Sequence, residues 1–172
     1  MKQLFSFIIA LVFIVACKSK DPVQKFEQRR VDKHWLDSVM KISDTSYTKP
    51  YRRTDFVTAS FYVNKKDSSV CQVMWDAEDM IRQVLLVRKN IRVFFAEYYS
   101  NGQLKAQLPL DEYGQYHGDA IYYFENGGIE SAGKYLHGLK TGSWEIYDER
   151  GKHLSTEEYD SNGQPIKSTG KN

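Results

Sequence analysis

Residues 142–151 read Gly-Ser-Trp-Glu-Ile-Tyr-Asp-Glu-Arg-Gly, and residues 118–127 read Gly-Asp-Ala-Ile-Tyr-Tyr-Phe-Glu-Asn-Gly. The two stretches start 24 residues apart, and each runs from one glycine to another. In the later stretch Trp144 and Ile146 alternate with polar neighbours, which is typical of a strand with one drier face. A strand followed by a turn therefore recurs in this chain, and such an internal repeat decides the fold.

A shorter interval of 12 residues runs through most of the chain. The ten positions on this interval are Tyr51, Val63, Trp75, Val87, Tyr99, Asp111, Tyr123, Tyr135, Tyr147 and Tyr159. Nine of the ten are apolar or aromatic, and most are followed by polar residues suited to turns. A strand of about eight residues and a turn of about four give this interval in an antiparallel meander. Asp111 is the exception, and we expect a longer loop at 108–111.

The glycines indicate where the turns of this meander lie. All 11 glycines occur from Gly102 onward, which at first favours two domains, one of them free of glycine. The 12-residue interval crosses that boundary, so we expect one continuous sheet over residues 51–167, with its clearest repeats at 98–166 and a polar tail at 168–172. Turns such as Asn-Gly accept positive φ, and we assign the turn glycines as Gly102, Gly127, Gly151 and Gly163. The predicted fold is mainly β: an elongated antiparallel meander of stacked hairpins with one N-terminal amphipathic helix.

The N-terminal segment, up to Cys17, has the composition of an export signal. Lys2 precedes an apolar run from Leu4 to Ala16, which is interrupted by Ser6. A membrane-spanning helix needs roughly 20 residues, so this shorter run fits the apolar region of a secretory signal peptide. It ends in Ile14-Val15-Ala16-Cys17, which resembles the lipobox of bacterial lipoproteins. The resemblance implies a signal peptide at 1–16, a lipidated Cys17 and a tether at 17–21; an ordinary signal peptide followed by an unrelated cysteine is the alternative.

A lipoprotein would lie in the bacterial cell envelope, outside the cytoplasm, with the outer membrane favoured over the inner. Its membrane contact would be the N-terminal lipid. Lipidation would leave Cys71 as the single thiol and would exclude an intramolecular disulfide. Cys71 lies in a strand-like run with no histidine in a recognisable pairing, so we expect a buried structural thiol rather than a nucleophile. The 24 basic and 22 acidic side chains nearly balance, which gives no reason to expect a nucleic-acid partner.

One amphipathic helix is expected at 22–42, between the tether and the sheet. Asp21 and Pro22 have the character of a helix start. An apolar stripe follows at helical spacing, formed by Val31, Trp35, Val39 and Ile42. Basic residues outnumber acidic ones around this helix, so contact with anionic lipid is one interpretation. Packing of the stripe on the sheet is favoured, because Trp35 and Val39 require an apolar partner.

The stretch Gly142–Gly151 resembles a MORN-type repeat, and more specifically the bacterial MORN-variant proteins labelled YwqK-like antitoxin components. The resemblance covers about residues 98–166, with its best units at 118–127 and 142–151 and a partial unit at 159–163. Two departures are that Ala120 stands where the repeat has Trp144, and that Arg150 replaces the asparagine of the turn. The resemblance implies an elongated sheet of stacked hairpins. It also implies an antitoxin role, which fits poorly with an exported chain.

The sequence offers no catalytic motif. Its adjacent carboxylates fall mostly in predicted turns, where acidic residues are expected in any case. His117 and His137 occupy non-equivalent positions of the 24-residue register, and His34 has no second ligand nearby. We therefore expect no enzyme activity, no metal site and no cofactor.

Aromatic side chains on an exposed repeat sheet would be the remaining means of binding a partner. The candidates are Tyr98, Tyr122, Trp144 and Tyr147, and the alternative is that these rings pack between strands or under the helix. The predicted function is a non-enzymatic envelope lipoprotein that presents its repeat surface to an unidentified protein for binding or scaffolding. The alternative function is an immunity or antitoxin-type protein that neutralises a cognate toxin.

Overall fold

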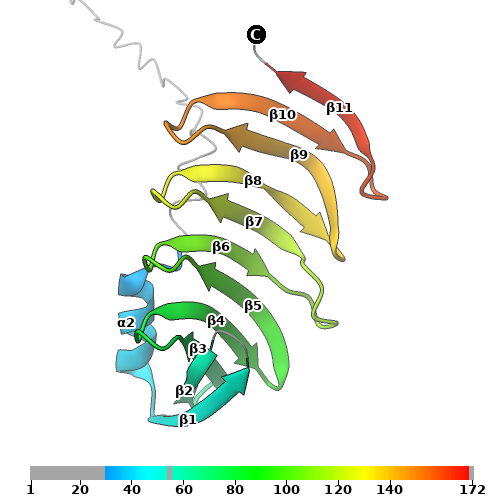
Figure 1. The fold of residues 1–172 in the computed structure, drawn as a ribbon. Helices are drawn as coiled ribbons and strands as arrows, with labels where there is room; N and C mark the ends of the chain where they lie inside the picture. Colours follow the sequence, from blue (N-terminus) through cyan, green and yellow to red (C-terminus); the bar gives the residue numbers. More distant parts are fainter. Residues whose placement is uncertain (1–29, 54–55, 171–172) are drawn as a thin grey trace, which may run out of the picture.

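A computed structural model of the chain describes residues 30–53 and 56–170, and these form one open sheet with a short helix against it (Figure 1). The eleven strands pair in chain order, and every pairing is antiparallel. Their bounds are β1 Thr45–Arg53, β2 Phe56–Asn64, β3 Ser69–Trp75, β4 Ile81–Arg88, β5 Ile91–Tyr98, β6 Leu104–Pro109, β7 Gly118–Tyr123, β8 Ile129–Leu136, β9 Leu139–Tyr147, β10 His153–Tyr159 and β11 Pro165–Gly170. The predicted antiparallel meander with one helix is confirmed.

The sheet extends beyond the predicted bounds at both ends. Strand β1 begins at Thr45, before the expected start at 51. At the other end, Ser168 and Thr169 pair with Glu157 and Thr156 of β10, so the predicted polar tail is wrong for residues 168–170. Without β11, the N–H and C=O groups along one side of β10 would have no partner. Backbone hydrogen bonds can satisfy these groups whatever side chains the pairing segment carries. The polar side chains of residues 168–170 therefore do not prevent these residues from joining the sheet.

Four turns share one backbone geometry, and they lie on the same edge of the sheet, by which we mean the side where β3, β5, β7 and β9 end. Their first residue donates its N–H to the carbonyl of the fifth, and their fourth residue has positive φ. These fourth residues are Asp79, Gly102, Gly127 and Gly151, with φ of 58°, 80°, 85° and 79°. Asp79 adopts the same conformation as the glycines because aspartate tolerates the left-handed region better than most residues. The glycine-free half of the chain thus has the same turn between β3 and β4, and one continuous sheet is the correct interpretation.

The opposite edge of the sheet holds the one long connection. Residues 110–117 join β6 to β7, with an isolated bridge between Leu110 and Tyr116. A long loop was expected at 108–111, but it starts later: Leu108 and Pro109 belong to β6, and the loop continues to residue 117. On the same edge, Gly163 has φ of 75° in the turn between β10 and β11. All four glycines predicted to lie in turns therefore have positive φ, the property from which they were predicted.

The helix is shorter than predicted. Helix α2 spans Lys33–Ile42, and the Asp32 side chain caps it by accepting the Trp35 N–H at 2.9 Å. Residue 30 and the two that follow it are not helical, so a continuous helix over 22–42 is wrong in this part; residues 22–29 lie outside the described residues, as do the signal peptide, Cys17 and the tether. No helix in the described parts of the chain is long and apolar enough to span a membrane.

Tertiary hydrogen bonds explain why the helix starts late. The Val31 N–H donates to Gln107 Oε1 at 3.2 Å, and the Tyr98 hydroxyl donates to the Val31 carbonyl at 2.9 Å. Both bonds engage backbone groups of Val31 with side chains of strands β5 and β6. Leu36, which lay outside the predicted stripe, is the buried residue of α2, and Ile42 is 65 % exposed.

Two apolar clusters lie against the sheet. The larger one includes Leu36 of the helix, and Trp35 and Val39 pack against it. The smaller one contains Ala106, Leu108, Ala120 and Trp144, with Phe95, Tyr122, Tyr135 and Tyr159 packed around them. Neighbouring residues of one strand divide between the clusters: Tyr122 packs against the smaller cluster, whereas Ile121 and Tyr123 belong to the larger. This is the alternation of a pleated strand that is covered on both faces.

Candidate functional site

The four aromatic residues predicted to bind a partner are part of the cores. Trp144 is 0 % exposed, Tyr98 6 % and Tyr147 9 %, and Tyr122 is half-buried. Burial raises the pKa of Tyr122, and so does the hydrogen bond between its hydroxyl and that of Tyr135, at 3.1 Å. The proposed aromatic binding face is therefore wrong, because these rings fill the space between strands and leave little area for a partner.

The last residue of each strand that enters the shared turn is aromatic. These residues are Trp75, Tyr98, Tyr123 and Tyr147. The 12-residue interval predicts Tyr99 at this position, but the last residue of β5 is Tyr98, one residue earlier. Tyr99 instead reaches along the edge, where its hydroxyl donates to the Tyr123 carbonyl at 2.8 Å.

Asparagines link successive turns on this edge. Asn101 Oδ1 accepts the Gln103 N–H within its own turn, and Asn101 Nδ2 donates to the Glu125 carbonyl in the next turn at 3.2 Å. Asn126 repeats the arrangement, with its Nδ2 2.9 Å from the Glu149 carbonyl. Arg150 stands at the equivalent place in the last such turn, where the described residues offer no further turn on that edge to bond.

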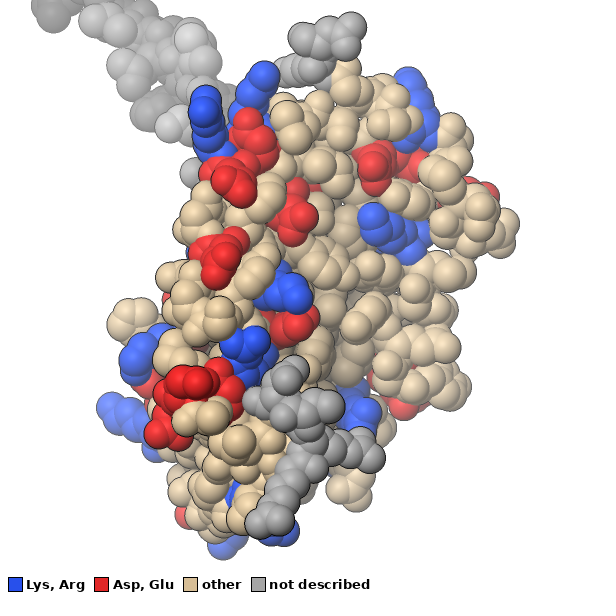
Figure 2. Space-filling model, in the orientation of Figure 1, with Lys and Arg blue, Asp and Glu red and all other residues tan. Residues whose placement is uncertain are grey.

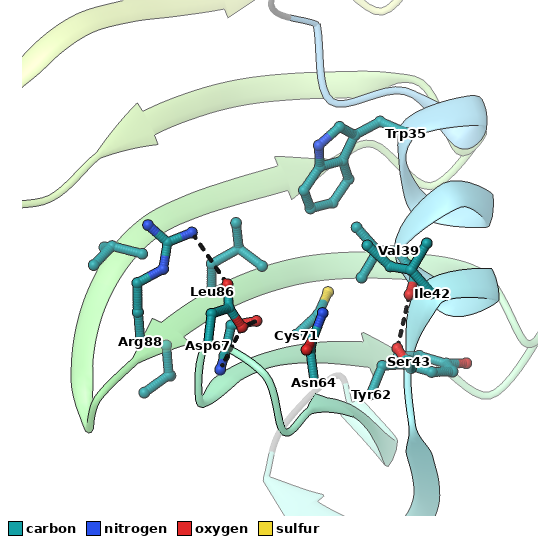
Figure 3. Close-up of a pocket in the computed structure, with 13 residues that line it drawn as sticks. Trp35, Val39, Ile42, Ser43, Tyr62, Asn64, Asp67, Cys71, Leu86 and Arg88 are labelled. Atoms are coloured by element: carbon teal, nitrogen blue, oxygen red, sulfur yellow. Dashed lines mark hydrogen bonds and ion pairs between the residues drawn. The ribbon is translucent and has the colours of Figure 1, made fainter.

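Cys71 is buried under the helix. It lines a small pocket of about 170 Å³ with Trp35 and Val39 from α2 and Leu86 from β4, and Arg88 pairs with Asp67 at 3.8 Å beside it (Figure 3). Burial raises the pKa of the Cys71 thiol to about 12. A thiol in this state is unreactive at neutral pH, which agrees with the structural role predicted from its strand context.

A second, larger hollow of about 340 Å³ lies where the N-terminal part of α2 meets the turn between β3 and β4. Its walls are mainly apolar, and we call it the helix groove. It is lined by Leu36, Met40, Trp75, Met80, Ile81, Tyr98 and Gly102, together with Asp32, Lys33, Asp37 and Asp79. Met80 packs closely on Gly102, since a Cβ on Gly102 would lie 2.9 Å from Met80 Cε. The helix groove has an apolar floor and a mostly acidic rim.

Charges of both signs are interspersed over the face seen in Figure 2, without a continuous basic surface on that face. Several of the described charges pair locally, for example Lys33 with Asp37 at 2.9 Å and Lys105 with Glu97 at 3.2 Å. This distribution suits the near balance of charge in the sequence. A stripe of cations that would follow a phosphate backbone is not visible on this face.

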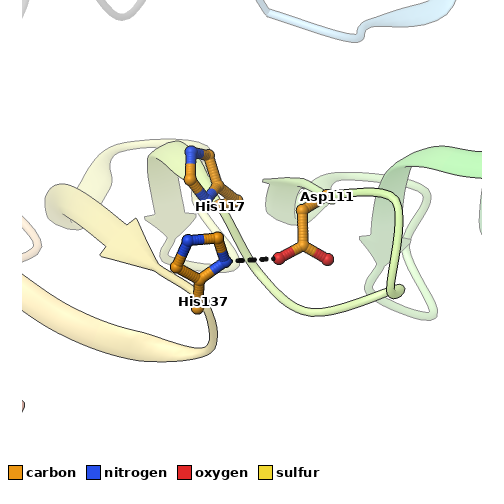
Figure 4. Close-up of side chains that lie close together, drawn as sticks. All are labelled: Asp111, His117 and His137. Atoms are coloured by element: carbon orange, nitrogen blue, oxygen red, sulfur yellow. Dashed lines mark hydrogen bonds and ion pairs between the residues drawn. The ribbon is translucent and has the colours of Figure 1, made fainter.

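Three side chains converge at the opposite edge of the sheet, where the β6–β7 loop meets the β8–β9 turn (Figure 4). They are Asp111, His117 and His137, and one ligand atom from each lies within 4.8 Å of the others. His137 Nδ1 and Asp111 Oδ2 are 2.9 Å apart. Burial pushes the pKa of Asp111 upward, but hydrogen bonds from His137 and from the N–H groups of Gln115 and Tyr113 outweigh it and lower that pKa.

The structure brings together two histidines whose positions in the repeat predict no shared site. His117 and His137 are separated along the chain by strands β7 and β8 and occupy different positions of the repeat. They meet because the long loop folds back on the neighbouring turn, where Gly138 N–H donates to the Tyr116 carbonyl at 2.8 Å. The sequence signal that was available was the loop itself, which interrupts the regular interval at Asp111.

Residues 95–111, 116–137 and 140–161 match a family model described as MORN repeat variant. These segments are similar to the MORN repeat variant. The three MORN-variant segments fall on three successive hairpins, β5–β6, β7–β8 and β9–β10. Each hairpin carries its shared turn on the same edge of the sheet, which accounts for the 24-residue interval.

No curated protein matches the chain significantly. Among solved structures, it is similar to the crystal structure of TarM, with 9 % identity and a TM-score of 0.37 over 68 % of this chain and 25 % of that one. It is also similar to a chain of accessory secretory protein 1, 2 and 3 in Streptococcus pneumoniae, with 12 % identity and a TM-score of 0.36 over 76 % of this chain and 23 % of that one. The chain thus spans about a quarter of each of these proteins, and scores this low carry no conclusion about it.

The two candidate sites differ in their relation to the MORN-variant segments. The helix groove is built mostly from residues that precede the first segment, including several from α2. His117 and His137 lie within the second segment, and Asp111 is the last residue of the first. The groove is therefore an addition to the repeat sheet, whereas the Asp–His cluster arises where two repeats join.

Proposed function

We propose that the protein is a lipid-anchored envelope protein that binds a second protein through the helix groove and catalyses no reaction. The observation that carries the proposal is the apolar groove itself, which is open to solvent, whereas Tyr122, Trp144 and Tyr147 pack within the cores. The MORN-variant segments are consistent with a binding or scaffolding role for such a sheet.

The groove suits a partner segment that offers one apolar side chain flanked by lysine or arginine. Trp75 supplies the kind of rigid aromatic surface that carries binding energy, and Met40 and Met80 are unbranched and adapt to a partner's shape. Asp32, Asp37 and Asp79 outnumber the single Lys33 in the lining. Carboxylates around an apolar floor favour a basic partner and disfavour an acidic one.

The experiment uses the full-length protein in native envelopes, with crosslinking and affinity capture. A double substitution, Met40→Asp with Met80→Asp, places charge on the groove floor. Ile166→Asp is the matched control, because Ile166 is 68 % exposed on β11, away from the groove. The expected result is a protein captured by the wild type and the control but lost from the double variant, with direct binding then confirmed using both purified proteins. Equal capture by the double variant would refute the groove as the binding site.

Charge complementarity has its own variant. Asp79→Asn removes one carboxylate while keeping a residue that tolerates the left-handed φ of 58° at this position. We expect weaker binding of the partner and a smaller dependence of the association rate on salt, because rim charges act mainly on association. Unchanged binding at every salt concentration would remove the basic flank from the proposal.

Lipid anchoring rests on the lipobox resemblance at Cys17 and is tested separately. Cys17→Ala should release the protein from the membrane fraction, and retention there would count against the anchor. The antitoxin alternative is an outcome of the same capture experiment. It would gain support if the captured protein were encoded next to this one and inhibited growth when expressed without it.

A further inference from the structure

We infer that Asp111, His117 and His137 form a binding site for a divalent transition cation of the zinc class. The three ligand atoms lie within 4.8 Å of one another and come from the loop between β6 and β7 and the turn between β8 and β9. The site stands independently of the proposed protein-binding function, because it uses the opposite edge of the sheet and shares no residue with the helix groove.

The spacing of the ligand atoms is close to what a zinc ion requires. Zinc bonds to nitrogen and oxygen at about 2.0–2.1 Å, which puts tetrahedral ligands about 3.3 Å from one another. Asp111 Oδ2 and His137 Nδ1 are already 2.9 Å apart. A cation would replace the proton that these two atoms share, and the imidazole of His117 would close the rest of the gap by a movement of about 1.5 Å or less.

His117 provides an observation that points to a ligand. Its Nδ1 atom is buried and has no hydrogen-bond partner among residues 30–53 and 56–170. A buried nitrogen without a partner costs free energy, and native structures contain few such atoms without a reason. The backbone of His117 is fixed, since its N–H donates to the Pro109 carbonyl at 2.9 Å. A cation beside this ring would give the imidazole the interaction that the protein does not supply.

The carboxylate of Asp111 is oriented by the backbone of its own loop. Its Oδ1 accepts the N–H groups of Tyr113 and Gln115, at 3.0 and 2.9 Å. These bonds leave Oδ2 facing the histidines. Hydrogen bonds that fix a ligand in this way are a regular part of metal sites, because they remove the entropy cost of orienting the ligand on binding.

His137 is held in place by an unusual backbone conformation. It has φ of 48°, and the next residue, Gly138, has φ of 82°. Two successive residues of positive φ form the tight hairpin turn that matches the twist of the strands. The strained residue thus presents its ring to the cluster, and 58 % of its side chain is exposed, which leaves room for water at a fourth position.

The donor set selects the class of cation. Two imidazoles and one carboxylate suit zinc and its transition-metal neighbours, whereas calcium and magnesium prefer sites made only of oxygen. His153 and His34 do not contribute: His153 Nε2 lies 2.6 Å from Glu145 Oε2, and His34 is exposed on α2. A bound cation would fasten the one long loop of the described sheet to the adjacent hairpin turn, at the point where the regular interval breaks.

The test uses the full-length protein in detergent, freed of metal with a chelator, and titrated with zinc alone in competition with a chromophoric chelator. We expect one equivalent of zinc per chain. Affinity should fall at least about tenfold in each of His117→Ala, His137→Ala and Asp111→Asn. Asp111→Asn is the most informative variant, because the amide oxygen still accepts the loop N–H groups, whereas an NH2 group that cannot bind a cation replaces Oδ2. His34→Ala is the control and should bind as the wild type does.

Two further measurements separate a lost ligand from a lost fold. Zinc should raise the Tm of the wild type and of His34→Ala, but not that of Asp111→Asn, while the metal-free proteins should melt alike. Cobalt, used in place of zinc, should give the visible absorption bands of a tetrahedral site, and these should disappear in the three variants. The inference is overturned if the wild type binds no stoichiometric zinc, or if Asp111→Asn and both histidine variants bind it with unchanged affinity.

Discussion

Trp144 stacks directly on Gly133 across the β8–β9 pair. A Cβ atom added to Gly133 would lie 2.4 Å from Trp144 Cδ2, closer than any real contact of that kind. The indole is fully buried, and its Nε1 donates to the Lys134 carbonyl at 3.1 Å. On its other sides it meets the Tyr135 ring, 5.1 Å between centroids, and the Lys140 ammonium, 4.4 Å from the ring centroid. The absence of a side chain at Gly133 is what creates room for the largest residue of the smaller core.

Gly133→Ala should therefore destabilise the protein strongly. The added methyl group must push the indole out of its site, and overpacking of this kind costs about 3 kcal/mol. Chemical unfolding measures the loss. Gly170→Ala is the matched control, because a Cβ there would meet only the Leu154 carbonyl at 3.8 Å, and a change within about 0.5 kcal/mol is expected. Equal stability of the two variants would contradict the close packing of Trp144 on Gly133.

Asn126 should matter more than Arg150, although both hold the third position of the same turn. Asn126→Asp keeps the acceptor for the Gly128 N–H but removes the donor to the Glu149 carbonyl. The lost hydrogen bond should cost about 1 kcal/mol in thermal or chemical unfolding. Arg150→Ala should change the free energy of unfolding by less than about 0.5 kcal/mol. A larger effect at Arg150 than at Asn126 would show that the bonds between turns are not what stabilises this edge.

Gly151 isolates the cost of a left-handed backbone. It has φ of 79°, and nothing lies within 4 Å of the place where a Cβ would go. Gly151→Ala should lower the free energy of unfolding by about 1 kcal/mol through backbone strain alone. Gly151→Asn should cost clearly less, because asparagine tolerates this conformation. If both variants were as stable as the wild type, the turn would adopt another geometry in solution.

Cys71 should be protected from alkylation in the native state and should contribute to alkaline unfolding. Its pKa is raised by burial from 9.0 to about 12. The folded state thus favours the neutral thiol, so its contribution to stability is complete below pH 9 and is lost as the pH rises from 9 toward 12. The free energy of unfolding should fall by at most about 1.4 kcal/mol per pH unit for this group.

Two measurements check the behaviour of Cys71. Peptide mapping after iodoacetamide treatment at pH 8 should show modification of Cys71 in urea and very little without it. Urea unfolding between pH 8 and 11 should show a shallower decline for Cys71→Ala than for the wild type. Tyr98 and Tyr122 are also raised in pKa by burial, so part of the decline should remain in that variant. Rapid native modification at pH 8 would place the thiol at the surface.

The repeat and its turns were predictable because they depend on local chemistry. In the Asn-Gly pairs at 101–102 and at 126–127 only the glycine has positive φ, a conformation that depends on the residue itself and not on distant contacts. The alternation of Trp144 and Ile146 with polar residues requires only the geometry of one strand. In the turn between β3 and β4 the equivalent position is occupied by Asp79 and not by glycine. Aspartate is nevertheless a residue type that accepts this conformation.

The predictions that were wrong concern features that depend on contacts with residues far away in the sequence. Asp21 and Pro22 are good helix-start residues, but the described helix begins after Asp32, because Tyr98 and Gln107 bond to the backbone groups of Val31 that a longer helix would use. The polar residues 168–170 became a strand because β10 offered them an unpaired edge. Tyr98, Trp144 and Tyr147 had the character of binding residues, but their neighbours on adjacent strands and hairpins bury them.

The sequence by itself determined the architecture: its short repeat interval, turn residues and alternating strands leave an antiparallel meander as the consistent solution. Only the tertiary structure decided what lies next to what. The helix groove joins α2 to a turn that follows three intervening strands, and the Asp–His cluster joins a loop to a turn that the repeat register does not relate. The physical reason is range: backbone conformation is set by neighbours along the chain, whereas a site requires side chains from several segments to meet in space.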